Sequence, residues 1–420
     1  MKKLYYLFCL LILSSAFTNA YSQCPPGRYY DKIYSKKTTN NVLFGRNNNY
    51  QGFPQDLYMD VYEPQGDNFA QRPLIILAFG GSFTSGVRQS PDLLVLTDEF
   101  AKRGYVTATI DYRIGRENGS DTAWFKSVIR GLQDMNAAIR YFYKDAVTAN
   151  KFRVDTNQIF IGGTSAGAVI GLNVAYYDFF YSSRPIDFDF IQILARMGGI
   201  WDGSGNEGYS HNVKGVVSLC GAIMDTFWLQ PGKPIVVAVH GTADSTIPFY
   251  YDSIRGLTDF KSRFFGDGDI NVRCNNIGLT HYLYPFYGAD HVPFVLPSTP
   301  YLPPSQQYMD TTIWVIRDFL YQNVVCDPTT ISGIEEAKYD LPVTVLSDFG
   351  EDVVSVISHN DKDLNVELFG VDGRLVEKKY LAAGTTQKIT KDDLGAGIYI
   401  LSFTNVNNPE VLKTQKIVFY

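Results

Sequence analysis

The chain has 420 residues, of which 45% are hydrophobic and 15% aromatic, so it can bury the cores of one large domain and one small one. The formal net charge is −6, and this acidic balance gives no basis for expecting nucleic acid or an anionic membrane as a partner. Most of the 29 tyrosines and 28 phenylalanines are expected in the core, and some of them in an apolar or carbohydrate-facing cleft.

The N-terminus has the three parts of an export signal. Lys2 and Lys3 supply the positive charge, residues 4–13 the apolar stretch, and residues 18–20 a small-residue cleavage site. We therefore expect residues 1–20 to be a signal peptide. A retained membrane anchor is the alternative, but the apolar stretch is short for a bilayer span. No later segment is apolar for long enough to cross a membrane, so no stable membrane insertion is expected.

Strand patterns alternate with helix patterns from about residue 43 to residue 326, which predicts an α/β fold with a mostly parallel sheet and helices on both faces. Residues 178–212 interrupt this alternation with phenylalanines and a Gly/Asn/Ser-rich stretch, so we expect a lid-like insertion there, within a domain of residues 21–326. The predicted strands are Leu57–Tyr62, Pro73–Phe79, Tyr105–Tyr112, Gln158–Ile161, Val213–Leu219, Pro234–Val239 and His281–Phe286, and the predicted helices start at Pro91 or span Phe125–Phe142 and Thr312–Tyr321.

The pattern changes near the C-terminus. Residues 327–340 are polar and unpatterned, as in a linker, and residues 341–420 contain only short alternating segments separated by turns. Such segments predict a small β-sandwich. A carbohydrate-binding sandwich is one alternative for this domain, although it has no obvious tryptophan platform.

Four cysteines remain once the signal peptide is removed, namely Cys24, Cys220, Cys274 and Cys326. An even number in an exported protein allows disulfides, with three full connectivities. A Cys24–Cys326 pair would tie together the two ends of the large domain. Cys220 lies in an apolar run, where a small buried residue is the alternative interpretation.

The segment Gly163–Gly167 is the most informative part of the chain. It follows the apolar run Gln158–Ile161 and opens the run Ala168–Leu172, so it is predicted to be a sharp turn between a strand and a helix. Small residues on both sides of Ser165 let the backbone bend tightly and direct the serine oxygen outward. A G-x-S-x-G match is common by itself, but in this context it predicts a nucleophile elbow with Ser165 as the nucleophile.

A serine nucleophile needs a base, and only five histidines are available. His359 lies in the C-terminal domain, His211 in the insertion, and His240 at the end of a buried strand, where a packed histidine is usual. His291 lies in a loop between a strand and the last helix, at the strand end where a base on a parallel sheet belongs. We therefore predict His291 as the base, with His281 as the main rival.

The group that orients the base is predicted in the same way. Asp244 leaves the end of an apolar strand in a turn of small residues, which makes it the candidate acid. A turn or N-cap aspartate is the alternative interpretation of that residue. Asp290 adjoins the predicted base in sequence, but chain neighbours rarely orient one another well, and Asp225 is a further rival.

Attack on an ester carbonyl places negative charge on its oxygen, which backbone N–H groups must stabilise. One N–H is expected from Ala166, which follows the nucleophile, and the other from Gly81 or Ser82 in the loop of residues 79–83, which follows an early buried strand. An ordinary strand-ending turn is the alternative for this loop. Among the aromatic residues, Phe83, Trp201 and Trp228 are the candidates for substrate binding.

These motifs together resemble the α/β-hydrolase superfamily, close to carboxylesterases and hormone-sensitive-lipase-like enzymes, over residues 27–326. Residues 79–82 resemble the family's H-G-G-G loop, the segment around Ser165 its elbow, His240–Asp244 its H-G-x-x-D turn, and Asp111–Arg113 its D-Y-R segment. Phe79 replaces the first histidine of the H-G-G-G loop. The resemblance implies a catalytic domain that cleaves carboxylic esters through Ser165, His291 and Asp244 in the family's chain order, with no metal or organic cofactor.

Residues 341–420 resemble the C-terminal sorting domain of type IX secretion cargo. The matching stretches are Val366–Phe369, Asp372–Arg374, Leu394–Tyr399 and Lys416–Phe419. This resemblance implies export across the inner membrane by the signal peptide and across the outer membrane by the tail, with the type IX machinery as partner. The protein is then secreted or attached to the cell surface.

Two other functions remain open at this point. A serine peptidase of the prolyl-oligopeptidase type would use the same chemistry, although the chain has no propeller-sized N-terminal region. A binding or adhesion protein on an inactive hydrolase scaffold is the second alternative. For an esterase, plant-wall acetyl or feruloyl esters, lipids and synthetic aromatic polyesters all remain open as substrates.

Overall fold

The chain forms two compact units, Met1–Thr329 and Thr330–Tyr420. The computed structural model describes residues 27–178, 188–201, 203–254, 263–295, 305–325, 343–347, 353–358, 362–370, 375–390, 397–406 and 411–419. The predicted signal peptide and the predicted linker lie outside the described residues.

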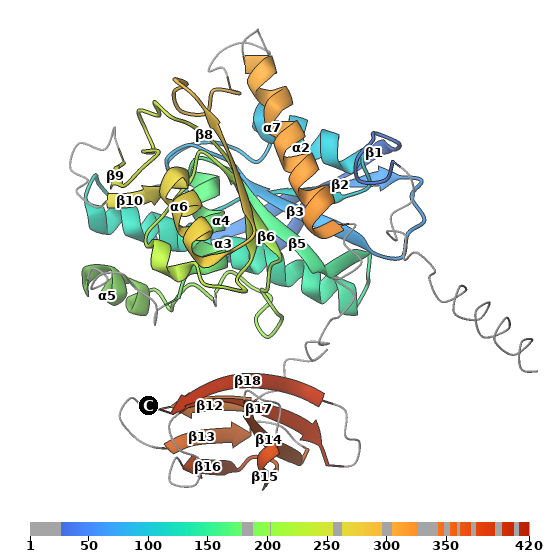
Figure 1. Cartoon of the computed structure of the whole chain (residues 1–420), viewed down its shortest axis with the longest axis vertical. Coiled ribbons are helices and arrows are strands. Elements are labelled where there is room, and N and C mark those ends of the chain that lie inside the picture. Colours follow the sequence, from blue (N-terminus) through green and yellow to red (C-terminus); the bar gives the residue numbers. More distant parts are fainter. Residues whose placement is uncertain are drawn as a thin grey trace, which may run out of the picture. The chain divides into compact units, whose positions relative to one another are not determined.

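The first unit is built on an eight-stranded sheet with the strand order β1-β2-β4-β3-β5-β6-β8-β11 (Figure 1). The β1–β2 and β2–β4 pairs are antiparallel, and every other pair is parallel. The strands are Ser35–Asn48 (β1), Pro54–Gln65 (β2), Arg72–Ala78 (β3), Val106–Ile110 (β4), Val154–Thr164 (β5), Gly215–Leu219 (β6), Ile235–Gly241 (β8) and His281–Phe286 (β11). The prediction of an α/β fold with a mostly parallel sheet is confirmed.

Burial explains the unbroken apolar runs of the central strands. Every residue of β3, β4 and β6 is buried, as expected for parallel strands that helices cover on both faces. Each large aliphatic side chain buried in this way contributes about 1.5–3 kcal/mol relative to exposure. The central sheet is therefore a rigid base for the loops that leave its strand ends.

Helices cover both faces of this sheet, with α2 and α7 packed together on one face and α3 and α4 on the other (Figure 1). Ser120 caps α3, since its hydroxyl accepts a hydrogen bond from the Ala123 N–H at 3.3 Å. The helices are Pro91–Ala101 (α2), Asp121–Val147 (α3), Ala166–Tyr176 (α4), Phe188–Arg196 (α5), Asp267–Ile277 (α6) and Ser305–Leu320 (α7). The shorter elements are Ala222–Ile223 (β7), Thr226–Trp228 (η1), Asp252–Ser253 (β9), Arg263–Gly266 (β10) and Tyr321–Val325 (η2).

The second unit consists of two antiparallel sheets, with the orders β12-β13-β16 and β15-β14-β17-β18. They share an apolar core of their own, which includes Val356, Leu364, Leu401 and Phe403. The predicted β-sandwich is thus confirmed. Its strands are Val343–Ser347 (β12), Val353–Ser358 (β13), Leu364–Gly370 (β14), Leu375–Leu381 (β15), Thr386–Thr390 (β16), Gly397–Asn405 (β17) and Val411–Phe419 (β18).

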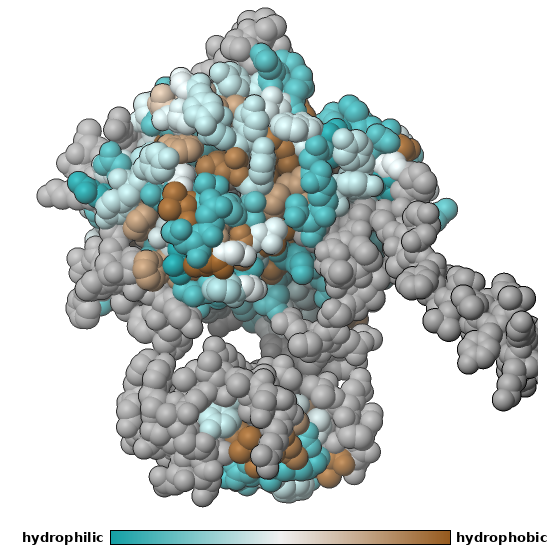
Figure 2. All heavy atoms as spheres, viewed as in Figure 1, coloured by the Kyte–Doolittle hydropathy of each residue, from teal (hydrophilic) through white to brown (hydrophobic). Residues whose placement is uncertain are grey.

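The surface of the first unit is mixed in character. The face shown in Figure 2 carries hydrophilic residues interspersed with smaller groups of hydrophobic ones. Among the described residues, no helix combines the length and the apolar character that a membrane span requires.

Candidate active site

Ser165 occupies the turn between β5 and α4 in a backbone conformation that residues other than glycine rarely adopt. Its φ is 55° and its ψ is −115°. Such a conformation costs on the order of 1–3 kcal/mol and persists only where the surrounding structure imposes it. The Ser165 N–H donates to the Leu219 carbonyl at 2.8 Å, and the neighbouring Thr164 hydroxyl donates to Asp92 Oδ2 at 2.5 Å. These bonds hold the turn in place.

His291 lies in the loop that follows β11, beside the turn of Ser165. Its Nε2 atom is 2.9 Å from Ser165 Oγ, and its Nδ1 atom is 2.6 Å from Asp244 Oδ2. Because Asp244 Oδ2 can only accept when ionised, Nδ1 carries the proton and Nε2 is free to accept from the serine hydroxyl. The structure thus brings together the three residues predicted as nucleophile, base and acid.

Asp244 lies in the loop that follows β8, which is adjacent and parallel to β11. Its Oδ1 atom accepts the N–H groups of Thr246 at 2.8 Å and Ile247 at 2.9 Å, which leaves Oδ2 directed at His291. Burial by itself raises the pKa of Asp244, but hydrogen bonds from His240 and His291 outweigh burial and hold this pKa well below its usual range. The Asp244 carboxylate is therefore ionised at neutral pH.

The rival residues have other partners. His281 contacts the Leu279 carbonyl at 2.7 Å and Asn271 Oδ1 at 3.1 Å. The His211 ring stacks on Trp201, with centroids 4.6 Å apart, and His359 lies outside the described residues. Asp290 Oδ1 accepts the N–H groups of Ser245 and His291, both at 2.7 Å, so it ties two loops together. Asp225 accepts the Phe227 N–H at 2.9 Å and caps η1.

The loop of residues 79–83 lies directly against the nucleophile. A Cβ atom on Gly80 would lie 3.3 Å from Ser165 Cβ. The backbone N–H groups of Gly81, Ser82 and Ala166 donate no hydrogen bond to any residue that the structure describes. Unpaired N–H groups of this kind, gathered near a nucleophile, suit the stabilisation of an oxyanion.

Aromatic packing supports this loop at Phe79, the position that corresponds to the histidine of the H-G-G-G loop it resembles. The Phe79 ring stacks on Tyr112 with centroids 4.3 Å apart, and the Tyr112 hydroxyl donates to the Phe79 carbonyl at 3.0 Å. Tyr112 belongs to the D-Y-R segment, but no pattern in the sequence marks it as a support for the loop.

Two of the three aromatic residues predicted to bind substrate are core residues. Phe83 is 2% exposed and packs edge-on against Trp124, and Trp228 is 0% exposed and packs against Tyr177. Both side chains are part of the buried core, and their role in substrate binding stays a prediction. Trp201 is half-buried and stacks on His211 within the insertion, so its predicted role stays a prediction.

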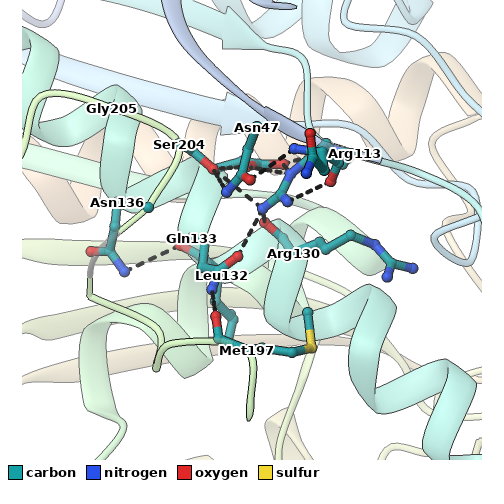
Figure 3. A network of polar contacts seen from close by, with 12 residues as sticks. Asn47, Arg113, Arg130, Leu132, Gln133, Asn136, Met197, Ser204 and Gly205 are labelled. Atoms are coloured by element: carbon teal, nitrogen blue, oxygen red, sulfur yellow. Dashed lines mark hydrogen bonds and ion pairs between the residues drawn. The ribbon is translucent and has the colours of Figure 1, made fainter. Parts of the chain in front are cut away.

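Helix α3 anchors the second half of the insertion through a buried polar network (Figure 3). Gln133 Nε2 donates to the carbonyls of Met197 and Gly199, both at 2.8 Å, and Asn136 Nδ2 donates to that of Ile200 at 2.9 Å. Arg140 contacts the carbonyls of Trp201, Gly203 and Gly205. These bonds therefore anchor residues 197–201 and 203–205 on α3.

Ser204 connects this segment to an ion pair beneath it. Its hydroxyl donates to Asp134 Oδ1 at 2.5 Å, and Asp134 is also paired with Arg113 at 2.9 Å. The Arg113 guanidinium contacts Ser204 Oγ at 3.2 Å (Figure 3). Arg113 ends the D-Y-R segment, and its partner could not be identified from the sequence.

The described cysteines of the first unit form no disulfide. Cys220 and Cys274 are buried free thiols, whereas Cys24 and Cys326 lie outside the described residues. Among the described residues, Cys220, Asp244 and His291 form the only group of three or more potential ligands, with their ligand atoms within 4.8 Å of one another. Two of these side chains already hydrogen-bond to each other beside Ser165, so we assign them no metal.

Comparisons with known proteins agree with the fold and with the second unit. Residues 59–179 match the BD-FAE family, and residues 351–419 match the secretion system C-terminal sorting domain. The first unit thus contains a BD-FAE domain, which is α/β-hydrolase- and esterase-like. The second unit carries a type IX C-terminal sorting domain, which supports export to the outer membrane or the cell surface.

No curated protein matches the chain. Among solved structures, Thermogutta terrifontis esterase 2 phosphoramylated by tabun is 19% identical, with a TM-score of 0.48, over 72% of this chain and 99% of that one. The butyrate-bound form of the same thermophilic esterase is 18% identical, with a TM-score of 0.47 and the same coverage.

Proposed function

We propose that the protein is an exported serine hydrolase that cleaves carboxylic esters. Ser165 is the nucleophile, His291 the general base, and Asp244 the group that orients the base. The observation that carries the proposal is the continuous array in which His291 lies 2.9 Å from Ser165 Oγ and 2.6 Å from Asp244 Oδ2. Three residues distant along the chain meet there in the geometry that activates a serine hydroxyl.

Acylation begins when Ser165 Oγ attacks the ester carbonyl carbon. The hydroxyl proton moves to His291 Nε2, and the C–O double bond becomes a single bond to a negatively charged oxygen. The N–H groups of Ala166 and of Gly81 or Ser82 stabilise this oxygen. The tetrahedral intermediate then collapses, and the alcohol leaves with the proton from His291 Nε2.

Deacylation uses the same groups in reverse. A water molecule gives its proton to His291 Nε2 while its oxygen attacks the acyl carbon. The collapse of the second tetrahedral intermediate breaks the bond to Ser165 Oγ, which regains the proton from Nε2. The ionised Asp244 carboxylate stabilises the imidazolium that forms in both halves of the cycle.

For localisation, we propose removal of residues 1–20 as a signal peptide and then export by the type IX machinery, which the match of residues 351–419 supports. Acyl and alcohol specificity stay open among plant-wall esters, lipids and aromatic polyesters. A peptidase of the prolyl-oligopeptidase type and an inactive binding protein remain the alternatives.

Labelling with a fluorophosphonate and hydrolysis of p-nitrophenyl butyrate test the proposal. Wild-type protein is expected to label and to hydrolyse the ester, whereas folded Ser165→Ala does neither. Ser35→Ala, which changes a remote serine on the edge strand β1, is the matched control and retains both activities. Folded wild-type protein that does not label would refute the triad, and cleavage of prolyl p-nitroanilides in preference to esters would favour the peptidase.

A further inference from the structure

A second histidine lies behind the proposed triad, at the end of β8. His240 is 0% exposed, and its ring packs edge-on against Phe249 with centroids 5.5 Å apart. A buried ring of this kind must satisfy both of its nitrogens within the protein. The partners of these nitrogens therefore determine its charge.

Both ring nitrogens of His240 face groups that accept hydrogen bonds. Nδ1 is 2.8 Å from Asp267 Oδ2, and Nε2 is 3.2 Å from Asp244 Oδ2 and 3.1 Å from the Ile247 carbonyl. A neutral imidazole has a single N–H, so one nitrogen would direct its lone pair at an acceptor. An imidazolium donates on both sides and satisfies this environment.

The carboxylate on the far side of the ring is itself fixed by donors. Asp267 begins α6, where its Oδ1 accepts the Ser218 hydroxyl at 2.8 Å and its Oδ2 accepts the Gly221 N–H at 3.0 Å. With these donors and His240 around it, Asp267 acts as an acceptor on both oxygens. The carboxylate therefore anchors the imidazole ring from the side opposite to Asp244.

The negative charges of Asp244 and Asp267 both face His240. In the described part of the chain, no lysine or arginine forms an ion pair with Asp244 or Asp267. The titratable groups that face His240 are these two aspartates, with His291 and Cys220 next to Asp244. A cationic His240 thus compensates two buried negative charges at once.

We propose that His240 is a positioning residue for the hydrolysis proposed above, which holds Asp244 as an imidazolium between Asp267 and Asp244. Its Nε2 atom hydrogen-bonds to the Ile247 carbonyl and lies in ion-pair contact with Asp244 Oδ2 at 3.2 Å, the same oxygen that accepts the proton of His291 Nδ1. His240 thereby fixes the orientation of the Asp244 carboxylate. The positive charge of His240 also partly neutralises the Asp244 carboxylate. Asp244 therefore stabilises protonated His291 less strongly than an unpaired carboxylate would.

The protonation equilibrium of His240 agrees with this geometry. Burial alone lowers the pKa of His240, but the hydrogen bonds and charges of Asp244 and Asp267 outweigh burial and raise the pKa to about 9. The cation is therefore present at neutral pH. Its loss would leave the full charge of Asp244 to stabilise a protonated base, which then needs a higher pH to lose its proton.

The pH dependence of kcat/KM for p-nitrophenyl butyrate tests the role of His240 in the full-length protein. His240→Gln removes the charge, and we expect kcat to fall about 10²-fold through misplacement of the base. The acidic limb of the pH profile should move upward by about 1 pH unit. His281→Gln, which changes a half-buried histidine without a contact to the triad among the described residues, should leave both unchanged.

Asp267→Asn offers a milder change to the same contact. An asparagine oxygen can accept from His240 and Gly221, while the Ser218 hydroxyl can turn to accept from the asparagine NH₂ group. This variant keeps the geometry and removes one charge. We expect the alkaline ionisation of kcat/KM that reports loss of the His240 proton to move below its wild-type position near pH 9, because one of the two carboxylates that raise the pKa of His240 is removed.

Two readouts separate failure of this proposal from failure of the triad. Fluorophosphonate labelling of the wild type tests Ser165 without reference to His240. If the wild type labels and His240→Gln shows an unshifted pH profile with full active-site occupancy, the positioning role is wrong. If His240→Gln does not fold, ¹⁵N chemical shifts of wild-type histidines at pH 7 decide: an imidazolium at His240 supports the proposal, and a neutral tautomer overturns it.

Discussion

A Cβ atom on Gly167 would lie 1.9 Å from the carbonyl oxygen of Ala78, the last residue of β3. No side chain can occupy that space unless the backbone moves. The first turn of α4 therefore approaches the end of β3 as closely as backbone permits. Since Ser165 begins this turn and the loop of residues 79–83 leaves β3, the contact determines how near the nucleophile and the oxyanion donors come to each other.

Gly167→Ala should therefore damage both the fold and the activity. We expect the free energy of unfolding to fall by about 3 kcal/mol, because an added methyl in a filled space displaces backbone. Urea unfolding measures the loss. Gly232→Ala is the control, since its Cβ would meet nothing within 4 Å and only its φ of 81° is unfavourable, which costs about 1 kcal/mol. Equal losses in the two variants would show that the close approach is unimportant.

Asp244→Asn tests the predicted acid. The amide can present an N–H group to His291 and favour the wrong tautomer, so we expect kcat to fall about 10⁴-fold. Asp290→Asn is the matched control, because Asp290 lies beside His291 in sequence and its Oδ1 accepts the backbone N–H groups of Ser245 and His291. Steady-state kinetics on folded protein should give this variant a kcat close to that of the wild type. The reverse result would make Asp290 the acid.

The buried strands are the part of the fold that the sequence predicts best. The unbroken apolar runs predicted β3 and β6 closely, and β11 begins and ends at the predicted residues. β1 was not predicted as a whole, since it is an edge strand in which only Phe44 is buried. α6 was missed because its sequence is polar and lacks apolar periodicity. Periodicity detects an element only when that element buries a continuous face.

The residues of the candidate site also differ in whether the sequence can predict them. The proposed triad residues could be named because each follows a recognisable apolar strand. The partner of His240 could not, since Asp267 lies 27 positions further along and belongs to the undetected α6. The contact between Asp134 and Ser204 spans 70 positions and leaves no pattern in the sequence. Such contacts depend on tertiary structure alone.

The stability of the first unit should depend on pH through His240. The folded protein raises the pKa of this residue from 6.5 to about 9, so its protonation stabilises the fold fully below about pH 6.5 and ceases to do so as the pH rises through 9. At about 1.4 kcal/mol for each pKa unit, this contribution is about 3 kcal/mol. Unfolding in urea at several pH values, compared between wild type and His240→Gln, measures it. A difference between the two proteins that does not change from pH 6 to pH 10 would argue against a cationic His240.

Asp134→Asn tests the anchoring of residues 197–206 on α3. Asp134 is 0% exposed and pairs with the equally buried Arg113, so the substitution leaves a buried guanidinium without its counter-charge. Breaking a buried pair in this way typically costs about 3–5 kcal/mol. Because asparagine has one accepting oxygen for the Arg113 and Ser204 donors that both Asp134 oxygens now serve, the contact with Ser204 weakens, and we expect limited proteolysis to cut near Ser204 before the rest of the unit.

Asp56→Asn provides the matched control for that variant. Asp56 pairs with Arg46 at 3.4 Å, but both side chains are exposed to solvent. Exposed pairs contribute about 0–1 kcal/mol, so this substitution should change neither the urea midpoint nor the proteolysis pattern appreciably. If Asp134→Asn behaves like Asp56→Asn in both measurements, the buried network does not hold the insertion. A large loss of stability with early cleavage in Asp134→Asn alone would show that α3 fixes residues 197–206 through Asp134.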